Sequence, residues 1–220
     1  MTKLLFVRHA ESLANAGGVT MPNDRIPLSP YGQNQASVLA DVLSITPAAV
    51  LVSAFQRTQE TAKRFCERVS VLPIVHPLLH EFCTIDPTII AGMNMEQRRP
   101  ITEGYWRDAD PDKRMGEDAE SFHEFAARVA GFEKELDGLA DSTVIFGHGM
   151  WLALLVWRLL GFSTQGSGAM QAFRRFQLAL PVSNCAIYAL ERSTGGNWSA
   201  RADEATTQRL NSSIMRHTFR

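Results

Sequence analysis

Short apolar runs recur along the chain, and this pattern of hydrophobic and polar positions predicts a series of β-strands. The first run, residues 4–7, is too short for a helix and stops at Arg8-His9. It is therefore expected to be a buried strand with two functional side chains at its carboxyl end. Five further runs are predicted to be strands: residues 49–53, 71–76, 142–147, 173–180 and 186–190.

Between several of these runs, apolar residues recur at intervals of three or four, which is the spacing of an amphipathic helix. Ser29-Pro30 is a typical helix start, because serine can cap the first turn and proline suits the first helical position. The second helical pattern places Arg57 in its first turn, directly after a predicted strand. Helices are expected at residues 30–44, 55–69, 117–139 and 150–160.

The alternation of strands and helices breaks over residues 77–116, which contain four prolines and mixed charges without sustained periodicity. A segment of this length inside a compact chain is usually a lid, a binding loop or a small helical insert. We therefore expect a single domain over residues 1–220, with 77–116 as a lid or substrate-specificity insertion. The tail after Gly195-Gly196 is expected to be a surface appendage.

A hydrophobic content of 45% and a charged content of 20% indicate a soluble globular protein. The net charge of −1 gives no global attraction to nucleic acid or to an anionic membrane, so neither is expected as a partner. Arg8 interrupts the first apolar run, which argues against a signal peptide. Cys66, Cys83 and Cys185 lack metal-ligand spacing and are expected to be buried, reduced thiols in a cytoplasmic protein. The oligomeric state is not indicated.

Three of the predicted strands end near a cation or a histidine. Arg8 offers a planar fork of donors suited to phosphate or carboxylate, and His9 can act as a nucleophile or proton carrier. Arg57 would be disfavoured at a helix N-terminus unless an anion lay nearby. His148 stands between two glycines where a strand meets a helix, a setting that favours a bound anion. Together these residues predict a pocket for an anion.

Each of these residues also has an ordinary structural explanation. Arg8 and His9 could cap a strand, Arg57 could be an exposed helix residue, and His148 could be a satisfied core histidine. Glu81 has apolar neighbours that could raise its pKa toward the range of a general acid, or it could be a solvated turn residue.

If these side chains meet, they suit phosphoryl transfer. One histidine would accept the phosphoryl group, and the carboxylic acid would protonate the leaving oxygen and later deprotonate water. The six histidines show no spacing typical of a metal site, and no metal is expected.

Five motifs occur in one order between residue 4 and about residue 190. They are Arg8-His9-Ala10-Glu11-Ser12, the helix start at 28–36, the segment 53–62, the helix at 116–129 and the strand end at 144–149. In this order the chain resembles the histidine phosphatase superfamily, the phosphoglycerate-mutase-like family. The Arg-His pair alone is not specific, whereas five motifs in order are.

The resemblance implies an α/β fold, a three-layer α/β/α sandwich with a mostly parallel sheet and a helical or loop insertion over the site. It implies that His9 is the phosphorylated nucleophile and Glu81 the proton donor, without a cofactor. The implied phosphate pocket consists of Arg8, Arg57 and His148, and the implied substrate contacts are Ser12, Asn15 and Gly149. Ala10 replaces the glycine usual in the family, and a positive φ there would be strained.

A phosphomonoesterase that forms a phosphohistidine intermediate is the leading hypothesis, because residues 82–92 lack the Glu-Arg-x-Tyr-Gly-x-Leu-x-Gly run typical of the mutases. The alternatives are a phosphoglycerate-mutase-type isomerase and a non-catalytic phospho-ligand binding protein. The expected substrate is a phosphorylated small molecule or a phosphopeptide. Within 77–116, four arginines could meet a second anionic group or could be solvated: Arg98, Arg99, Arg107 and Arg114.

Overall fold

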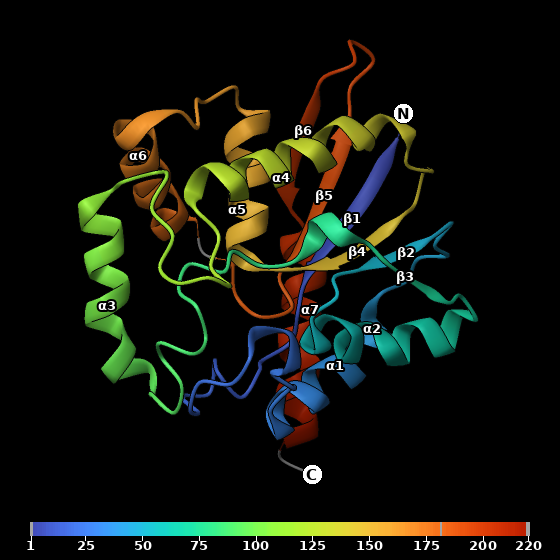
Figure 1. Ribbon diagram of the computed structural model, residues 1–220. Helices are drawn as coiled ribbons and strands as arrows, with labels where there is room; N and C mark the ends of the chain where they lie inside the picture. The colour runs from blue at the N-terminus through green and yellow to red at the C-terminus, as the bar shows by residue number, and fades with distance from the viewer. Residues whose placement is uncertain (1, 181, 219–220) are drawn as a thin grey trace.

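A six-stranded sheet forms the centre of the computed structural model, which describes residues 2–180 and 182–218 (Figure 1). The strands are β1 (Lys3–Arg8), β2 (Val50–Val52), β3 (Pro73–Val75), β4 (Val144–Gly147), β5 (Ile187–Arg192) and β6 (Trp198–Ala202), in the spatial order β3-β2-β4-β1-β5-β6. Strands β1 to β4 pair in parallel, β5 runs antiparallel to β1, and β6 runs antiparallel to β5. Among the described strands, β5 is the one that runs in the opposite direction to the others, so the predicted mostly parallel sheet is confirmed.

Strand β1 lies in the interior of the sheet because residues 4–7 are apolar on both faces and are buried on both. It pairs with β4 so that Arg8 is opposite Gly147. The next residues along the two strands, His9 and His148, therefore leave the sheet at the same edge. This register brings together two histidines that are far apart in the sequence.

Helices cover both faces of the sheet and complete the three layers that the family resemblance implied (Figure 1). One face carries α1 (Pro30–Val42), α2 (Gln56–Val69) and α7 (Glu204–Thr218), and the other carries α4 (Phe122–Glu135), α5 (Gly149–Leu159) and α6 (Gly166–Ala179). Successive side chains of β1 point to opposite faces of the sheet and so enter two separate halves of the core. Leu4 and Phe6 pack with the α4–α6 layer, whereas Leu5 and Val7 pack with the α1, α2 and α7 layer.

Serine caps decide where two helices begin. Ser29 caps α1, and Pro30 is its first residue, as predicted. Ser121 caps α4 in a reciprocal arrangement, since its Oγ accepts from the Glu124 N–H at 3.2 Å while the Glu124 carboxylate accepts from the Ser121 N–H at 2.8 Å. The helix predicted over 117–139 therefore begins only after Ser121.

The apolar run predicted a strand over residues 173–180, but residues 173–179 belong to helix α6 and Leu180 is its C-cap. Phe173 is buried in the core, and Phe176 and Leu180 pack against the same core at intervals of three and four residues. That spacing is helical, and a short apolar run alone does not distinguish a strand from a buried helix. The strand prediction was wrong.

The tail after Gly195-Gly196 is part of the fold rather than a surface appendage. Strand β6 pairs with residues 188–192 of β5, and α7 packs against α1. Leu210 and Ile214 of α7 are buried in the core between the sheet and the layer of α1, α2 and α7. The tail was misjudged because its few apolar residues occupy only one narrow face of a helix.

Residues 77–116 form a small helical insert, one of the forms expected for this segment. It comprises a 3-10 helix, η2 (Pro77–Leu79), a loop and helix α3 (Met95–Asp108). Tyr105 and Trp106 anchor α3 in the aromatic core beside α6. The role of the insert as a lid or a specificity element stays a prediction. Two further 3-10 helices are η1 (Asn23–Arg25) and η3 (Leu136–Gly138).

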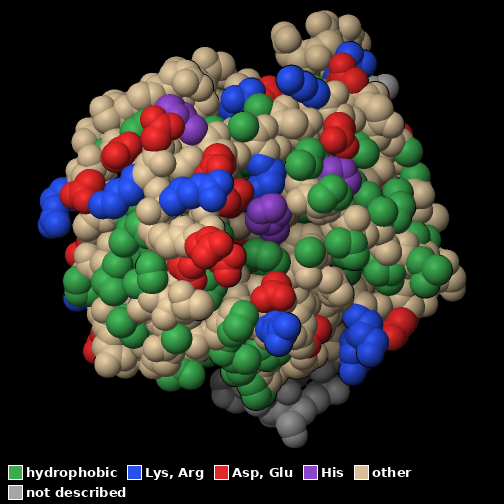
Figure 2. All heavy atoms as spheres, in the orientation of Figure 1, with side chains coloured by type: hydrophobic (Ala, Val, Ile, Leu, Met, Phe, Trp, Pro, Cys, Tyr) green, Lys and Arg blue, Asp and Glu red, His purple; other side chains and the backbone are tan. Residues whose placement is uncertain are grey.

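The distribution of surface charge and the burial of two of the three cysteines agree with the expectations from composition. Figure 2 shows acidic and basic side chains interspersed over one face, in keeping with the net charge of −1. Among the described helices, none is long and apolar enough to cross a membrane. Cys66 and Cys185 are buried free thiols, but Cys83 is partly exposed, contrary to expectation, because it lies on the irregular insert.

Candidate active site

A cavity of about 260 Å³ lies at the carboxyl end of β1, where the sequence placed the site. Its wall contains six of the eight predicted site residues: Arg8, His9, Ser12, Asn15, Arg57 and Glu81. The insert, which carries Glu81, also contributes Phe82, Ile85, Ile90, Arg98 and Thr102 to the lining. The two remaining predicted residues, His148 and Gly149, lie behind this wall in contact with the first group.

Two guanidinium groups make the cavity positive: that of Arg57 is buried and that of Arg8 is partly buried. Arg8 donates from Nη1 to the Val182 carbonyl, and Arg57 donates from Nη1 to the Asn23 carbonyl at 2.7 Å. Burial lowers the pKa of both groups, that of Arg57 to about 10, with the neighbouring Arg8 charge lowering it further. Each arginine remains charged near neutral pH. Gly149 allows this packing, since a Cβ there would lie 3.2 Å from the Arg8 Nε.

His9 is held as a neutral imidazole with a defined tautomer. Its Nδ1 lies 2.7 Å from the Ala10 carbonyl, which can only accept, so the proton is on Nδ1. Its Nε2 accepts a hydrogen bond from the Arg57 Nε at 3.3 Å and carries the lone pair. Burial, together with the charges of Arg57 and Arg8, holds the pKa of His9 well below its ordinary value. The arrangement presents a nucleophilic nitrogen to a bound anion.

His148 is fully buried, and its ring lies edge-on to the His9 ring with 5.2 Å between centroids. Its Nε2 is 2.8 Å from the Ser53 Oγ, while its Nδ1 has no partner within residues 2–180 and 182–218. Burial, followed by the nearby charges of Arg57 and Arg8, holds the pKa of His148 well below its ordinary value. The unpartnered nitrogen is suited to contact a ligand oxygen.

The Glu81 carboxylate lies at the N-terminus of α5. It accepts hydrogen bonds from the backbone N–H groups of Met150 at 3.1 Å, Trp151 at 3.0 Å and Phe82 at 3.0 Å. The apolar setting inferred from its neighbours in the sequence was therefore only part of its environment. The N-terminus of α5 supplies two of the three donors, and this tertiary contact has no signal in the local sequence.

Ser12 and Asn15 form one side of the cavity. The Asn15 Oδ1 accepts from the Ser12 Oγ at 3.1 Å and from the Asn184 Nδ2 at 3.1 Å, and Asn184 also donates to the His9 carbonyl at 3.0 Å. Sequence reasoning missed Asn184, which precedes β5 and carries no motif of its own. It also missed Ser53, whose position at the end of a predicted strand was the available signal.

The four arginines of the insert have different environments. Arg98 lines the cavity, where it donates to the Thr20 Oγ1 at 2.9 Å. Arg99 and Arg114 pair with glutamates near the surface, and Arg107 is exposed. Of the four, Arg98 is the one placed to meet a second group of a ligand.

The strain anticipated at Ala10 does not occur. Ala10 is not among the described residues with positive φ, and its N–H donates to the Thr61 Oγ1 at 3.0 Å. The described residues contain no group of three His, Cys, Asp or Glu side chains that could hold a metal ion. The His217 side chain lies outside the described part of the chain. Independence from metals stays a prediction.

Comparison with known proteins gives a family and a fold. The model of the histidine phosphatase superfamily (branch 1) matches residues 4–204. The adenosylcobalamin/alpha-ribazole phosphatase of Salmonella typhimurium is 31% identical over 171 residues, which cover 72% of this chain and 79% of that protein. A probable phosphoglycerate mutase, GpmB, of Cronobacter sakazakii is 28% identical over 85% of this chain and 83% of its own length.

Solved structures of the same architecture include two phosphatases. The mycobacterial glucosyl-3-phosphoglycerate phosphatase superposes with a TM-score of 0.67 at 23% identity, covering 92% of this chain and 97% of that one. The alpha-ribazole phosphatase of Shigella flexneri superposes with a TM-score of 0.70 at 22% identity, covering 91% and 95%. At these identities the likeness demonstrates the shared fold.

Proposed function

The chain belongs to branch 1 of the histidine phosphatase superfamily and is a phosphomonoesterase, and we propose that it works through a phosphohistidine formed on His9. The observation that carries this proposal is the state of His9 beside the guanidinium groups of Arg8 and Arg57. Its proton is on Nδ1, its Nε2 lone pair is available, and its neighbours attract a phosphate. The same three groups form one wall of the cavity.

In the first step, the His9 Nε2 attacks phosphorus and the bond from phosphorus to the ester oxygen breaks. Glu81 in its acid form gives its proton to the departing alkoxide, which leaves as the alcohol. Arg8 and Arg57 bind the phosphoryl oxygens and stabilise the charge that they carry in the transition state. His148 contributes a hydrogen bond from Nδ1, its nitrogen without a protein partner.

In the second step, the Glu81 carboxylate takes a proton from water as the water oxygen attacks the phosphohistidine. The nitrogen–phosphorus bond breaks, inorganic phosphate forms, and His9 recovers its lone pair. Glu81 regains the proton that it lost in the first step, so the cycle is balanced. One carboxyl group can serve both steps because the leaving oxygen departs from phosphorus, and the water attacks it, on the side opposite His9.

The substrates of this site are phosphorylated small molecules. A cavity of about 260 Å³ suits a small phosphate ester, whose remainder would meet the apolar side chains of Ile85 and Ile90 and the Arg98 guanidinium. The relatives named as probable mutases do not change the proposal, because residues 82–92 lack the mutase run that should follow Glu81. Activity on 3-phosphoglycerate with and without a bisphosphorylated primer would identify a mutase.

His9→Ala tests the proposal. The variant should lose turnover of p-nitrophenyl phosphate by at least about 10³-fold, because the covalent route is removed. Rapid quenching with radiolabelled substrate should trap an acid-labile, base-stable phosphoenzyme in the parent and none in the variant.

His123→Ala is the matched control, since His123 lies on α4 and pairs with Asp112 at the surface. It should retain both turnover and the phosphoenzyme. Near-parent turnover in His9→Ala, or a phosphoenzyme still formed without His9, would remove His9 as the nucleophile.

A further inference from the structure

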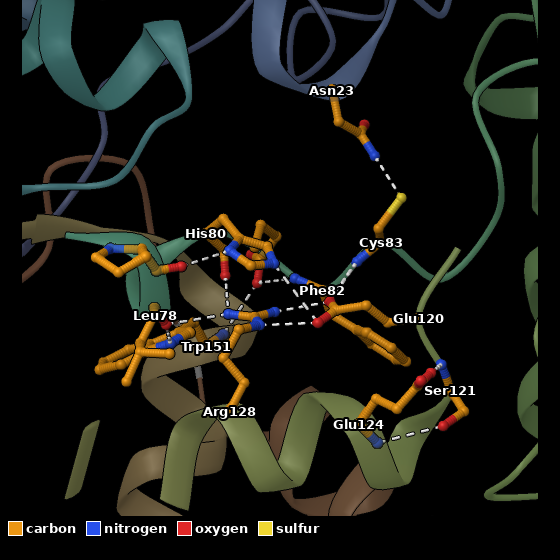
Figure 3. A network of polar contacts seen from close by, with 12 residues as sticks. Asn23, Leu78, His80, Phe82, Cys83, Glu120, Ser121, Glu124, Arg128 and Trp151 are labelled. Atoms are coloured by element: carbon orange, nitrogen blue, oxygen red, sulfur yellow. Dashed lines mark hydrogen bonds and ion pairs between the residues drawn. The ribbon is translucent and has the colours of Figure 1, made fainter. Parts of the chain in front are cut away.

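Glu81 lies on a segment that has no regular secondary structure to hold it. Residues 80–84 are neither helix nor strand, yet the Glu81 carboxylate must meet both the leaving oxygen and the N-terminus of α5. A proton donor that moves by about 1 Å can lose much of its effect. Some other element must therefore fix this part of the backbone (Figure 3).

Arg128 of α4 binds the backbone directly before Glu81. Its Nη1 donates to the Leu78 carbonyl at 3.1 Å and to the His80 carbonyl at 2.6 Å. Its Nε and Nη2 donate to the two carboxylate oxygens of Glu120 at 2.8 and 2.7 Å. The guanidinium side chain is only 9% exposed, so these bonds form largely out of water.

Glu120 binds the backbone just after Glu81. Its carboxylate accepts from the Cys83 N–H at 3.3 Å, and its own N–H donates to the Cys83 carbonyl at 2.9 Å. Although burial raises the pKa of Glu120, hydrogen bonds from His80 and Arg128 lower it to about 2. Glu120 is therefore charged at neutral pH, and the ion pair holds the chain on both sides of Glu81.

Two aromatic side chains, those of Trp151 and Phe82, complete the attachment of the Glu81 segment to the helices. The Trp151 indole donates from Nε1 to the Leu78 carbonyl at 2.7 Å, while the backbone N–H of the same residue donates to Glu81. Phe82 stacks on Phe125 of α4 with 4.5 Å between ring centroids. Figure 3 shows Arg128 at the centre of this network, reaching from α4 to the segment that carries the acid.

We propose that the Arg128–Glu120 ion pair is the positioning device for Glu81, and that it acts on leaving-group protonation without contacting the substrate. This inference rests on the proposed function, because it takes Glu81 as the proton donor. Neither Arg128 nor Glu120 is in the wall of the cavity. The pair should therefore influence kcat for poor leaving groups and leave KM nearly unchanged.

Arg128→Met is the direct test, with two substrates that differ in leaving group. On an alkyl phosphate such as glycerol 2-phosphate, kcat should fall by about 10-fold or more, because its alkoxide needs the proton. Single-turnover phosphorylation of His9 by p-nitrophenyl phosphate should change by less than about 3-fold. In a Glu81→Gln background the same substitution should have almost no further effect on the alkyl substrate, since both changes would remove one function.

The matched control is Arg158→Met, which breaks another arginine–glutamate pair, between Arg158 of α5 and Glu133 of α4, that makes none of the contacts to residues 78–83. It should leave the ratio of alkyl to aryl rates at the parent value. If Arg128→Met does not fold, two other variants carry the test. Arg128→Met/Glu120→Met removes both charges, and Arg128→Lys keeps the charge without the planar fork. Both should reduce the alkyl-to-aryl ratio.

Equal loss on both substrates, or losses that multiply with Glu81→Gln, would overturn the inference, and so would an unchanged ratio in every folded variant. The phosphoenzyme separates this outcome from failure of the proposed function. If Arg128→Met and its parent both form phosphoenzyme from the aryl substrate at equal rates, the His9 chemistry stands, and the alkyl rates alone decide the role of the ion pair.

Discussion

The two ring nitrogens of His9 are held by opposite partners. A backbone carbonyl accepts a hydrogen bond from the Nδ1–H group, and a guanidinium N–H donates to Nε2. The first contact fixes the tautomer, and the second disfavours protonation of the other nitrogen. A phosphate entering the cavity would compete for the Arg57 donor and leave Nε2 free to attack. The residue is therefore prepared as a nucleophile by its neighbours rather than by its own chemistry.

His9 should stay neutral as the pH falls through its ordinary pKa of 6.5, because burial and the two arginines lower the folded-state value. Nitrogen-15 NMR between pH 7.5 and 5.5 should show one neutral, Nδ1-protonated ring. The stability linked to this residue is present above pH 6.5 and is lost as the pH falls below it, since the unfolded chain then binds a proton that the folded chain does not. Protonation of His9 between pH 6 and 7 would contradict this state.

Glu81→Gln should separate the two roles of the carboxyl group. Glutamine is nearly isosteric but cannot give up a proton, so hydrolysis of alkyl phosphates should fall by roughly 10²-fold or more. Phosphorylation of His9 by an activated aryl phosphate should slow much less, because that leaving group departs unaided. Single-turnover measurement isolates this step from dephosphorylation, which also needs the carboxylate.

Equal losses on alkyl and aryl substrates would mean that Glu81 only shapes the pocket. Asp86 would then be the next carboxyl to test on the insert. Its geometry makes it a weak alternative, since its Oδ1 accepts from the Thr88 N–H at 2.8 Å and its Oδ2 from the Asp118 N–H at 3.0 Å. Those bonds are typical of a residue that closes a loop.

At the scale of elements, helix starts carry much of the site. The N-terminus of α5 receives Glu81, and the first turn of α2 contains Arg57. Helix α4 contributes differently, because its interior residue Arg128 holds a neighbouring segment. The capping box at Ser121 sets where α4 begins. The start of the helix in turn sets the position of Arg128 along the helix axis, beside the insert.

Ser121→Ala should destabilise the protein by about 1 kcal/mol, the usual effect of losing a helix cap. The reason is that the Glu124 N–H would lose the Ser121 Oγ as its partner. Urea unfolding followed by far-ultraviolet circular dichroism measures the change. Ser44→Ala, at an exposed position after α1, should leave the midpoint nearly unchanged. A midpoint equal to that of the parent in Ser121→Ala would show that water replaces the cap.

At the scale of the whole molecule, the sheet edge collects the site from distant segments. Residues 8–23, 53–61, 81–102, 148–151 and 182–185 all contribute contacts to it. Helix α7 belongs to the layer formed with α1 and α2, and it lies on the face of the sheet away from the insert (Figure 1). The carboxyl-terminal segment therefore supports the strands that carry the candidate site residues.

Leu210→Ala should destabilise the fold by about 2–5 kcal/mol, since it deletes a buried side chain between α7 and the sheet. Met215→Ala on the same helix should have an effect within about 0.5 kcal/mol, because Met215 is 59% exposed. Guanidinium unfolding of both variants provides the comparison. Similar losses at the two positions would indicate that α7 does not pack as described.

The sequence by itself determined the strands of the parallel part of the sheet, most helices, and the arginines and histidines that the fold brings together at the cavity. Residues 4–7 and 142–147 are short apolar runs that are followed by arginine or histidine, and Ser29-Pro30 is a helix start. These signals are local, so they can be read from the sequence without a structure. The run at 173–180 failed because a short apolar stretch suits either a strand or a buried helix, and only packing against α3 and α5 selected the helix.

Tertiary structure alone decided how the site is held. Glu81 meets the α5 N-terminus 69 and 70 residues away, and Arg128 reaches carbonyls 48 and 50 residues away. Asn184 joins His9 from 175 residues along the chain. Such contacts depend on how three layers stack, and their backbone donors and acceptors are the same whatever the side chains. For that physical reason the sequence could name the chemical groups, whereas only the fold could show what positions them.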